Sequence, residues 1–375
     1  MGPRRLGPVN GTLATTLTDL AVRVGPVLIF LVAITVVAEI ADAAGVFDVA
    51  GHWAARAGHG HTWLLWLLVV VLSCLSTIFL SLDTTAVLLT PVVVAVARQL
   101  RLSPLPFAMT TVWLANTASL LLPVSNLTNL LALHRFSALG LGYTGYIRLA
   151  LWPALAAIAA TVVVLGTLHL RALQGRYSTE APPAPHDRTL LRIAAAVCIA
   201  LGPAFVSGVV PAVPASVAAL ILVGTLVVRN RPLLRTVKVP WAIVLAISAL
   251  FVVVDLALGH GLRELLGGWV GTGNGPADLL RISAVAAGTA NVANNLPAYL
   301  ALESVTDADP RRLMALLIGV NVGPLVTIWA SLATILWRER CRRAAITISL
   351  WRFAWQGALC AVAATLAATL TLALT

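Results

Sequence analysis

Charged side chains are scarce in this sequence: only 10% of its 375 residues are Asp, Glu, Lys or Arg, whereas 59% are hydrophobic. A water-soluble globule of this size needs more polar surface than such a composition supplies, and this excludes a soluble enzyme. Apolar runs of about 17 to 25 residues recur along the chain, which is the length that an α-helix needs to cross a bilayer. The sequence therefore predicts a multi-pass protein of the plasma membrane with the lipid bilayer as its solvent.

Residues suited to metal, nucleotide or covalent chemistry are also few. The four cysteines, Cys74, Cys198, Cys341 and Cys360, are scattered without a CxxC pair, and the seven histidines fall in loops or at the ends of spans. The segment GTGNGP at 271–276 lacks the Lys-Ser/Thr pair of a phosphate-binding loop. We therefore expect no cofactor, no metal and no enzymatic activity, and we expect transport energy to come from an ion gradient or a separate partner.

Basic residues outnumber acidic ones by 25 to 14, for a net charge of +11, and Lys238 is the only lysine. They concentrate in short loops between apolar runs, at 171–192, 229–238 and 338–343. This distribution is typical of cytoplasmic loops in membrane proteins, and it argues against nucleic-acid binding. We place these three loops in the cytoplasm.

The order of elements in residues 1–170 recurs in residues 189–375, on either side of a cytoplasmic linker at 171–188. Each half contains a helical hairpin with a polar tip, then a broken helix, then a continuous helix. In the first half, a span near 24–44 comes first, and the hairpin, broken helix and continuous helix follow at 62–99, 105–134 and 147–170. In the second half, three spans near 190–209, 212–228 and 239–258 come first, and the same three elements follow at 279–304, 312–337 and 346–374. We predict an all-α integral membrane protein, an inverted-repeat secondary transporter with two re-entrant hairpins and two broken helices. The first hairpin enters from the cytoplasm and the second from outside.

The polar breaks of the two halves align with each other. SLDTTAVLLTP at 81–91 matches ANNLPAYLALE at 293–303, with Asp83 opposite Asn295, and WLANTASLLLPVSNLTN at 113–129 matches IGVNVGPLVTIWASLAT at 318–334, with Asn116 opposite Asn321. Non-helical backbone at membrane depth is tolerated only where it is enclosed by protein or faces a watery cavity. The breaks therefore predict a substrate cavity lined by hydroxyl and amide groups: Asn116, Thr117, Ser119, Ser125, Asn126, Asn129, Asn294, Asn295, Asn321 and Ser331.

Four acidic residues fall in or near apolar spans. Asp83 occupies the first hairpin tip beside Thr84, and we predict that these two residues form the site of proton or sodium coupling, although Asp at such a position also caps helices. Glu39, Asp255 and Glu303 fall at the ends of their spans, where a solvated, interfacial position is expected.

The sequence resembles the arsenite/antimonite efflux permeases of the ion transporter superfamily in SLDTTAVLLTP (81–91), ANTASLLLPVSNLTNL (115–130), ANNLPA (293–298) and VNVGPLVTIWASLATILW (320–337). The resemblance implies export of arsenic or antimony hydroxide in exchange for protons, in some members with a soluble ATPase subunit. It also implies a scaffold part and a transport part with two hairpins and two broken helices. Members often carry Asp where this chain has Asn116 and Asn321, and Lys where it has Leu325.

Other functions compatible with the sequence are transport of a carboxylate or another anion, sodium/proton antiport, and a membrane scaffold that transports nothing. No Arg or Lys occurs at 62–97 or 282–310, so an anion bound near the hairpins would depend on helix N-termini alone. A scaffold would leave the paired breaks without a role. The sequence leaves open whether the small-molecule substrate is a metalloid or an anion. It also leaves open whether the chain forms a homodimer.

Overall fold

The computed structural model describes residues 9–178, 187–207, 209–229, 231–232, 263–306 and 309–375, together with single positions between 241 and 261. Within these ranges the chain is helical and forms no strand, apart from one isolated bridge between His61 and Arg176. Six of the described helices are long and apolar enough to cross a membrane. A bent pair, Leu28–Ala43 with Val46–Ala57, meets at 59° and gives a seventh span if it is counted as one. The prediction of an all-α membrane protein is confirmed.

The first half begins with a long helix, α1 (Val9–Ala43), and a short one, α2 (Val46–Ala57). The hairpin follows as α3 (Thr62–Phe79), then α4 (Leu82–Thr84), a π-helical turn η1 (Thr85–Leu89) and α5 (Thr90–Gln99). The broken helix consists of α6 (Pro104–Thr117), the 3₁₀ turns η2 (Ala118–Leu120) and η3 (Pro123–Ser125), and α7 (Leu127–Ala138). The continuous helix α8 (Gly142–Leu168) and a short α9 (Leu170–Leu173) complete this half.

The second half begins with α10 (Arg188–Val206) and α11 (Ala212–Arg229), and the span predicted at 239–258 lies outside the described residues. After α13 (Arg263–Val270) come the hairpin helices α14 (Pro276–Ala293) and α15 (Asn295–Thr306). The broken helix consists of α16 (Pro310–Val322) and α17 (Leu332–Arg343), and α18 (Leu350–Leu374) is the final helix.

The continuous helix that ends each half starts at another residue than predicted. The helix expected at 147–170 begins at Gly142, and the one expected at 346–374 begins at Leu350. Ile346 and Ile348 lengthen the apolar run, but they pack against the core from a non-helical connection, and Ser349 caps the helix by accepting a hydrogen bond from the backbone N–H of Arg352. Apolar periodicity alone did not reveal this cap.

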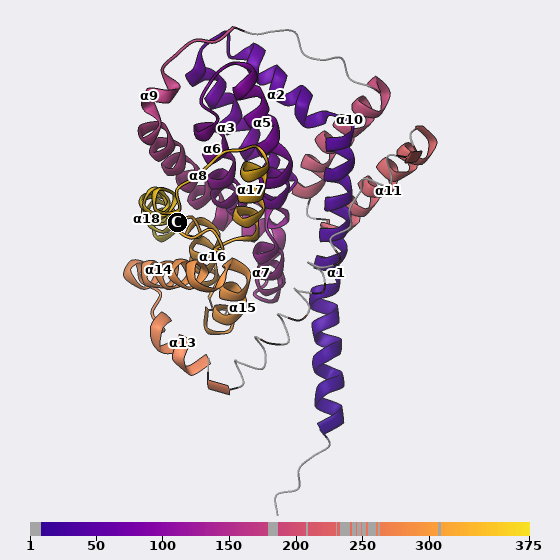
Figure 1. The fold of residues 1–375 in the computed structure, drawn as a ribbon. Coiled ribbons are helices and arrows are strands. Elements are labelled where there is room, and N and C mark those ends of the chain that lie inside the picture. The colour runs from indigo at the N-terminus through magenta and orange to yellow at the C-terminus, as the bar shows by residue number, and fades with distance from the viewer. Residues whose placement is uncertain are drawn as a thin grey trace, which may run out of the picture.

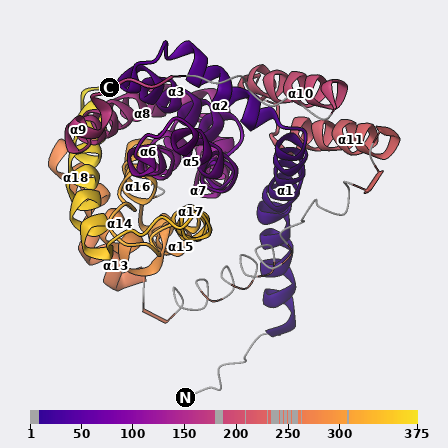
Figure 2. The same cartoon turned by 45° about the horizontal axis from the view of Figure 1, so that its top comes forward.

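The two hairpins occupy opposite ends of the molecule. Figure 1 shows α3 and α5 in the upper half and α14 and α15 in the lower half. Helices α8 and α18 pack against each other along their length, and α14 packs against α16. Helix α1 packs against α10 and α11 to one side of this bundle, as Figures 1 and 2 both show.

Part of the predicted linker is anchored to the turn between α2 and α3. The backbone N–H of Thr62 donates to the carbonyl of Gly175, and the N–H of Tyr177 donates to the carbonyl of Gly60. The Tyr177 hydroxyl donates to the carbonyl of Ala55 at 2.7 Å. Residues 175–177 therefore hold the ends of α2 and α3 together.

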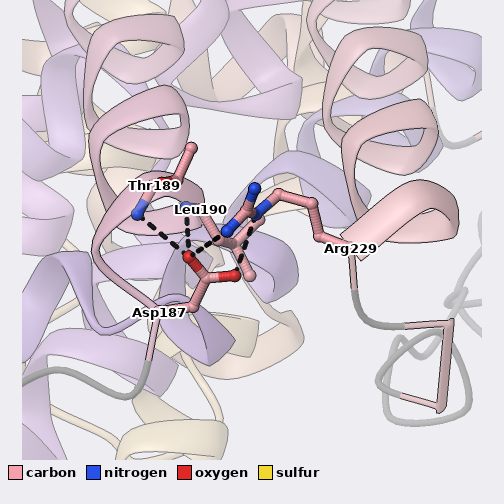
Figure 3. A network of polar contacts seen from close by, with 4 residues as sticks. All are labelled: Asp187, Thr189, Leu190 and Arg229. Atoms are coloured by element: carbon pink, nitrogen blue, oxygen red, sulfur yellow. Dashed lines mark hydrogen bonds and ion pairs between the residues drawn. The ribbon is translucent and has the colours of Figure 1, made fainter.

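The end of the linker is fixed by an ion pair between α10 and α11. Asp187 precedes α10 and accepts hydrogen bonds from the backbone N–H groups of Thr189 and Leu190, at 2.9 and 3.0 Å. Its carboxylate also pairs with the guanidinium of Arg229 at the end of α11 (Figure 3). The hydrogen bonds from Arg229 and from the two N–H groups lower the pKa of Asp187 from 3.8 to about 2.

This ion pair predicts a pH-dependent effect of Asp187→Asn. The amide keeps an oxygen to cap α10 but carries no charge for Arg229. Because the pKa of Asp187 is depressed in the folded state, the ion pair's contribution to stability is present above pH 3.8 and is lost as the pH falls towards about 2. The melting temperature of the variant should be slightly below that of the unmutated protein at pH 7, and the difference should vanish towards pH 2. An identical difference at both pH values would contradict this account.

Close helix packing in the second half depends on glycine. A Cβ atom at Gly319 in α16 would lie 2.4 Å from both the Cβ of Ala286 and the carbonyl oxygen of Ser283 in α14. A Cβ at Gly357 in α18 would lie 1.9 Å from the carbonyl oxygen of Leu325. Small residues let helices approach this closely in membranes, where van der Waals packing is a main source of helix association.

We predict that Gly319→Ala lowers the free energy of unfolding by about 1–3 kcal/mol, because the added methyl group overpacks the contact between α14 and α16. Gly288→Ala is the matched control, since it changes a glycine of α14 that has no atom within 4 Å of the added Cβ. The control should be neutral or slightly stabilising because alanine favours helix. Thermal unfolding in detergent measures both effects, and equal melting temperatures for the two variants would contradict the prediction.

Candidate transport site

The first break forms where α6 ends and the chain leaves the helical conformation. Pro123 begins the turn η3, and Asn126 adopts an extended backbone conformation immediately before α7. The side-chain oxygen of Asn126 accepts from the backbone N–H of Thr128 and so caps α7. Asn129 donates to the carbonyls of Ser119 and Leu122, at 2.6 and 3.1 Å, and thereby satisfies two carbonyls that the break exposes.

The second break, residues 323–331, is organised by Asn291 of α14. Its amide nitrogen donates to the carbonyl of Gly323, and its oxygen accepts from the backbone N–H groups of Val326 and Thr327. Ser331 then caps α17 by accepting from the N–H of Thr334. The predicted site residues did not include Asn291, and its supporting role appears only in the structure.

The two breaks are joined by reciprocal side-chain hydrogen bonds. Asn321, near the end of α16, donates to the side-chain oxygen of Asn129 in the first turn of α7 at 2.6 Å. In the aligned positions, Asn116 near the end of α6 donates to the hydroxyl of Thr334 in the first turn of α17 at 3.5 Å. The oxygen of Asn321 also accepts from the hydroxyl of Thr128 at 2.7 Å and from the amide of Asn126 at 2.9 Å. Each broken helix is therefore fastened to the restart of the other.

The hairpin tips are held against the breaks. Ser125 donates to the carbonyl of Ile78 at the end of α3, and the backbone N–H of Asn295 donates to the carbonyl of Ala330. Asn294 leaves the helical conformation with φ 89°, and its amide donates to the carbonyl of Trp329 at 2.8 Å. Each hairpin is thus anchored to the broken helix of its own half.

A cavity of about 670 Å³ opens between the two hairpin tips and α1. Its polar lining residues are Thr35, Glu39, Ser81, Asp83, Thr84, Asn126, Asn294 and Asn295, and none of the lining residues in the described chain is Arg, Lys or His. The first residues of α4, α7, α15 and α17 also contribute to its wall. The partial positive charges of these helix N-termini therefore lie at the cavity.

Two side chains in this wall are left without hydrogen bonds to other described residues. Ser81 caps α4 by accepting from the backbone N–H of Thr84, so Asp83 has no capping role. One carboxylate oxygen of Asp83 is buried without a partner. The amide of Asn295 makes no side-chain hydrogen bond within the described chain, although this residue is only 5% exposed and lines the cavity. These two groups come one from each hairpin tip.

The structure divides the predicted site residues into two sets. Asp83, Thr84, Asn126, Asn294 and Asn295 line the cavity. The remainder lie behind the wall in the breaks and are fully buried: Asn116, Thr117, Ser119, Ser125, Asn129, Asn321 and Ser331. Thr117 and Ser119 donate only to nearby carbonyls of their own segment, those of Trp113 and Asn116. The set behind the wall supports the cavity, and the roles of both sets in binding stay predictions.

One of the acids that we expected in a solvated position is buried. Glu303 is 3% exposed; it accepts a hydrogen bond from the hydroxyl of Tyr299 at 2.7 Å and pairs with Arg135 of α7 at 3.3 Å. The expectation failed for Glu303 because it used position along a span, whereas the packing of α15 on α7 decides burial. Glu39 is partly exposed and lines the cavity. Asp255 lies outside the described residues.

Helical hairpins and interrupted helices around a cavity, in a chain with several helices apolar enough to span a membrane, are the features of a membrane transporter. The model of the citrate transporter family, CitMHS, matches residues 11–319, and the chain belongs to this family. Its relatives include the arsenical pump membrane protein of Yersinia enterocolitica, 30% identical over 355 residues, which cover 85% of this chain and 79% of that protein. The protein of the same name from Escherichia coli is 29% identical over 351 residues, with the same coverage of both chains.

A solved structure gives the fold alone. The structure of the YdaH transporter of Alcanivorax borkumensis, described as having an unusual topology, superimposes on this chain with a TM-score of 0.69 at 15% sequence identity. The match covers 97% of this chain and 87% of the YdaH chain. The predicted membership in a transporter family that includes arsenical pumps is confirmed, as is the prediction that the protein is not an enzyme.

Replacing Asn321 tests the junction between the breaks. Asn321→Leu removes the partner of Asn126, Thr128 and Asn129 at once, and each buried polar group left unpaired costs about 1–3 kcal/mol. We expect a lower melting temperature in detergent and loss of transport. Asn274→Leu is the control because Asn274 is exposed in the loop before α14, where its side chain bonds Asp309 and no other residue of the described ranges. A variant at position 321 as stable as this control would show that the junction does not hold the breaks together.

Proposed function

We propose that this protein exports arsenite or antimonite in exchange for protons. The observation that carries the proposal is the polarity of the cavity: amides, hydroxyls and two carboxylates line it, and no basic side chain of the described chain does. Arsenite and antimonite are largely uncharged hydroxides near neutral pH. Their hydroxyl groups both donate and accept hydrogen bonds, which suits a carboxylate from Asp83 and an amide from Asn295.

A polycarboxylate such as citrate is the second candidate because the family carries that description. The helix N-termini at the cavity would attract its negative charge. However, Asp83 and Glu39 line the same cavity without a basic side chain to offset them. Two acidic side chains facing a polyanion are unfavourable, and this makes a neutral hydroxide the better match.

Coupling is assigned to Asp83, with Thr84 beside it. An ionised carboxylate with a buried, unpartnered oxygen is costly, so Asp83 is better accommodated protonated or in contact with a solute or cation. Binding of a proton and of the metalloid would then alternate at the same group. Exchange of this kind needs no nucleotide. The soluble ATPase subunit, the coupling ion and the homodimer stay predictions from the sequence.

Alternating access is proposed to use the inverted repeat. The hairpins occupy opposite ends of the molecule, and the cross-bonds of Asn116 and Asn321 connect equivalent positions of the two breaks. In this proposal the α3–α5 hairpin enters from the cytoplasm and the α14–α15 hairpin from outside. The cavity between their tips would open to one side at a time.

We predict that a metalloid-sensitive host expressing the chain accumulates less arsenite or antimonite than the same host without it. Asn295→Leu should abolish this effect because it removes an unpaired amide from the cavity without breaking a side-chain hydrogen bond of the protein. Asn274→Leu should retain it. Cellular metalloid content measures the outcome, with membrane abundance of each variant as the control. Unchanged accumulation with the unmutated chain, together with transport of a dicarboxylate, would favour the anion carrier.

We predict that Asp83→Asn binds substrate but loses gradient-driven transport. The amide keeps the shape and hydrogen-bonding capacity of the acid but cannot bind and release a proton. The measurement is arsenite flux into inverted membrane vesicles under an imposed pH gradient, compared with arsenite binding to the purified variant. A variant that concentrates arsenite like the unmutated protein would remove Asp83 from the coupling mechanism.

A further inference from the structure

Helix α1 contributes one continuous face to the transport cavity. Phe30, Leu31, Ile34, Thr35, Ala38 and Glu39 all line it. This spacing of three to four residues keeps the six side chains on one side of the helix, and at 1.5 Å per residue they extend over about 14 Å. Glu39 is the last of them and the only ionisable one, so it marks the end of the cavity where α1 approaches α2.

A second acidic residue lies one helical turn beyond Glu39. Asp42 is three residues further along α1 and is exposed, and the charges of Asp48, Glu39 and Arg340 all act on its carboxyl group. Arg340 belongs to α17 and to the arginine-rich segment 338–343 that the sequence predicts in the cytoplasm. Asp42 therefore lies near Arg340 of this arginine-rich segment, whereas Glu39 lines the cavity.

We propose that Glu39 and Asp42 form a proton pathway from Asp83 to the cytoplasmic face. This inference rests on the proposed exchange of substrate for protons. The proton on the Asp83 carboxyl passes to the Glu39 carboxylate through water in the cavity, then to Asp42 and to bulk solvent. Each acceptor oxygen gains the proton that the previous group loses, so no other reactant is needed. A cavity of about 670 Å³ has room for such waters besides a small solute.

The surroundings of Glu39 favour this direction of transfer. Cavity residues toward the other end of α1, from Phe30 to Ala38, are apolar except for Thr35, whose hydroxyl donates to the carbonyl of Leu31. Asp83 lines the same cavity as Glu39, and the charges of Glu39, Asp48 and Arg340 act on Asp42. The other titratable and charged side chains on the helices packed against α1 are His52 and Arg56 on α2, His134 and Arg135 on α7, Arg188 and Arg192 on α10, and Arg229 on α11.

The test measures proton release when arsenite binds to the purified full-length chain in lipid nanodiscs, followed with a pH-sensitive dye in a stopped-flow instrument. The unmutated protein should release protons on mixing. At saturating arsenite, Glu39→Gln should release the same number of protons, but the rate should fall by about tenfold or more. Glu39→Asp, which keeps a carboxyl group, should release protons at nearly the unmutated rate. Glu264→Gln in α13 is the matched control and should behave like the unmutated protein, since Glu264 is exposed and does not line the cavity.

Chemical rescue separates a proton carrier from a structural residue. A small weak acid such as azide should restore fast release in Glu39→Gln because it can replace the missing carboxyl group. Unchanged release in Glu39→Gln, or slow release that neither azide nor Glu39→Asp corrects, would overturn the pathway while leaving the proposed exchange intact. Arsenite binding to the unmutated protein without any proton release would overturn the proposed exchange and the pathway with it.

Discussion

The hydrogen bonds that cross between the two broken helices are the constraint on which the rest of this structure depends. A helix that stops at membrane depth exposes carbonyl and N–H groups that lipid cannot satisfy. Here Asn129 satisfies the carbonyls of its own break and offers its side-chain oxygen to Asn321 of the other. Residue 321 must therefore supply a hydrogen-bond donor, and the side-chain amide of Asn321 does so as an uncharged group. The junction is neutral, and the acidic groups lie at the hairpin tip and on α1.

This neutral junction supports the cavity from behind. The hairpin tips rest on the breaks through the bonds of Ser125 and of the Asn295 backbone, and the capped starts of α7 and α17 face the space between them. Most of the supporting residues form hydrogen bonds with one another or with nearby backbone, whereas Asp83 and Asn295 line the cavity, where we propose that the solute binds. A transporter needs both kinds of polar group, one set that holds irregular backbone in place and another that stays open to what is carried.

Sequence reasoning located the breaks, the hairpins and most of the helix ends because each has a local physical signal. Proline and clustered amides interrupt an apolar run, and Asp83 and Asn295 stand out as polar groups at hairpin tips. Other features had no such signal. Glu303 and Glu39 fall at the ends of their spans, where a solvated position is the ordinary expectation, yet one pairs with Arg135 and the other lines the cavity. Their partners are distant in sequence, so only packing reveals them.

The sequence by itself determined that this chain is an all-helical membrane protein with two hairpins and two broken helices, because hydrophobic length and the cost of unpaired backbone in lipid are local properties. Only the tertiary structure decided which polar groups support the breaks and which face the cavity. That division depends on hydrogen bonds between residues nearly two hundred positions apart, such as Asn129 and Asn321. An amide in a polar break has the same appearance in sequence whether its partner is a neighbouring helix or a solute, and the packing of helices around it settles which one it meets.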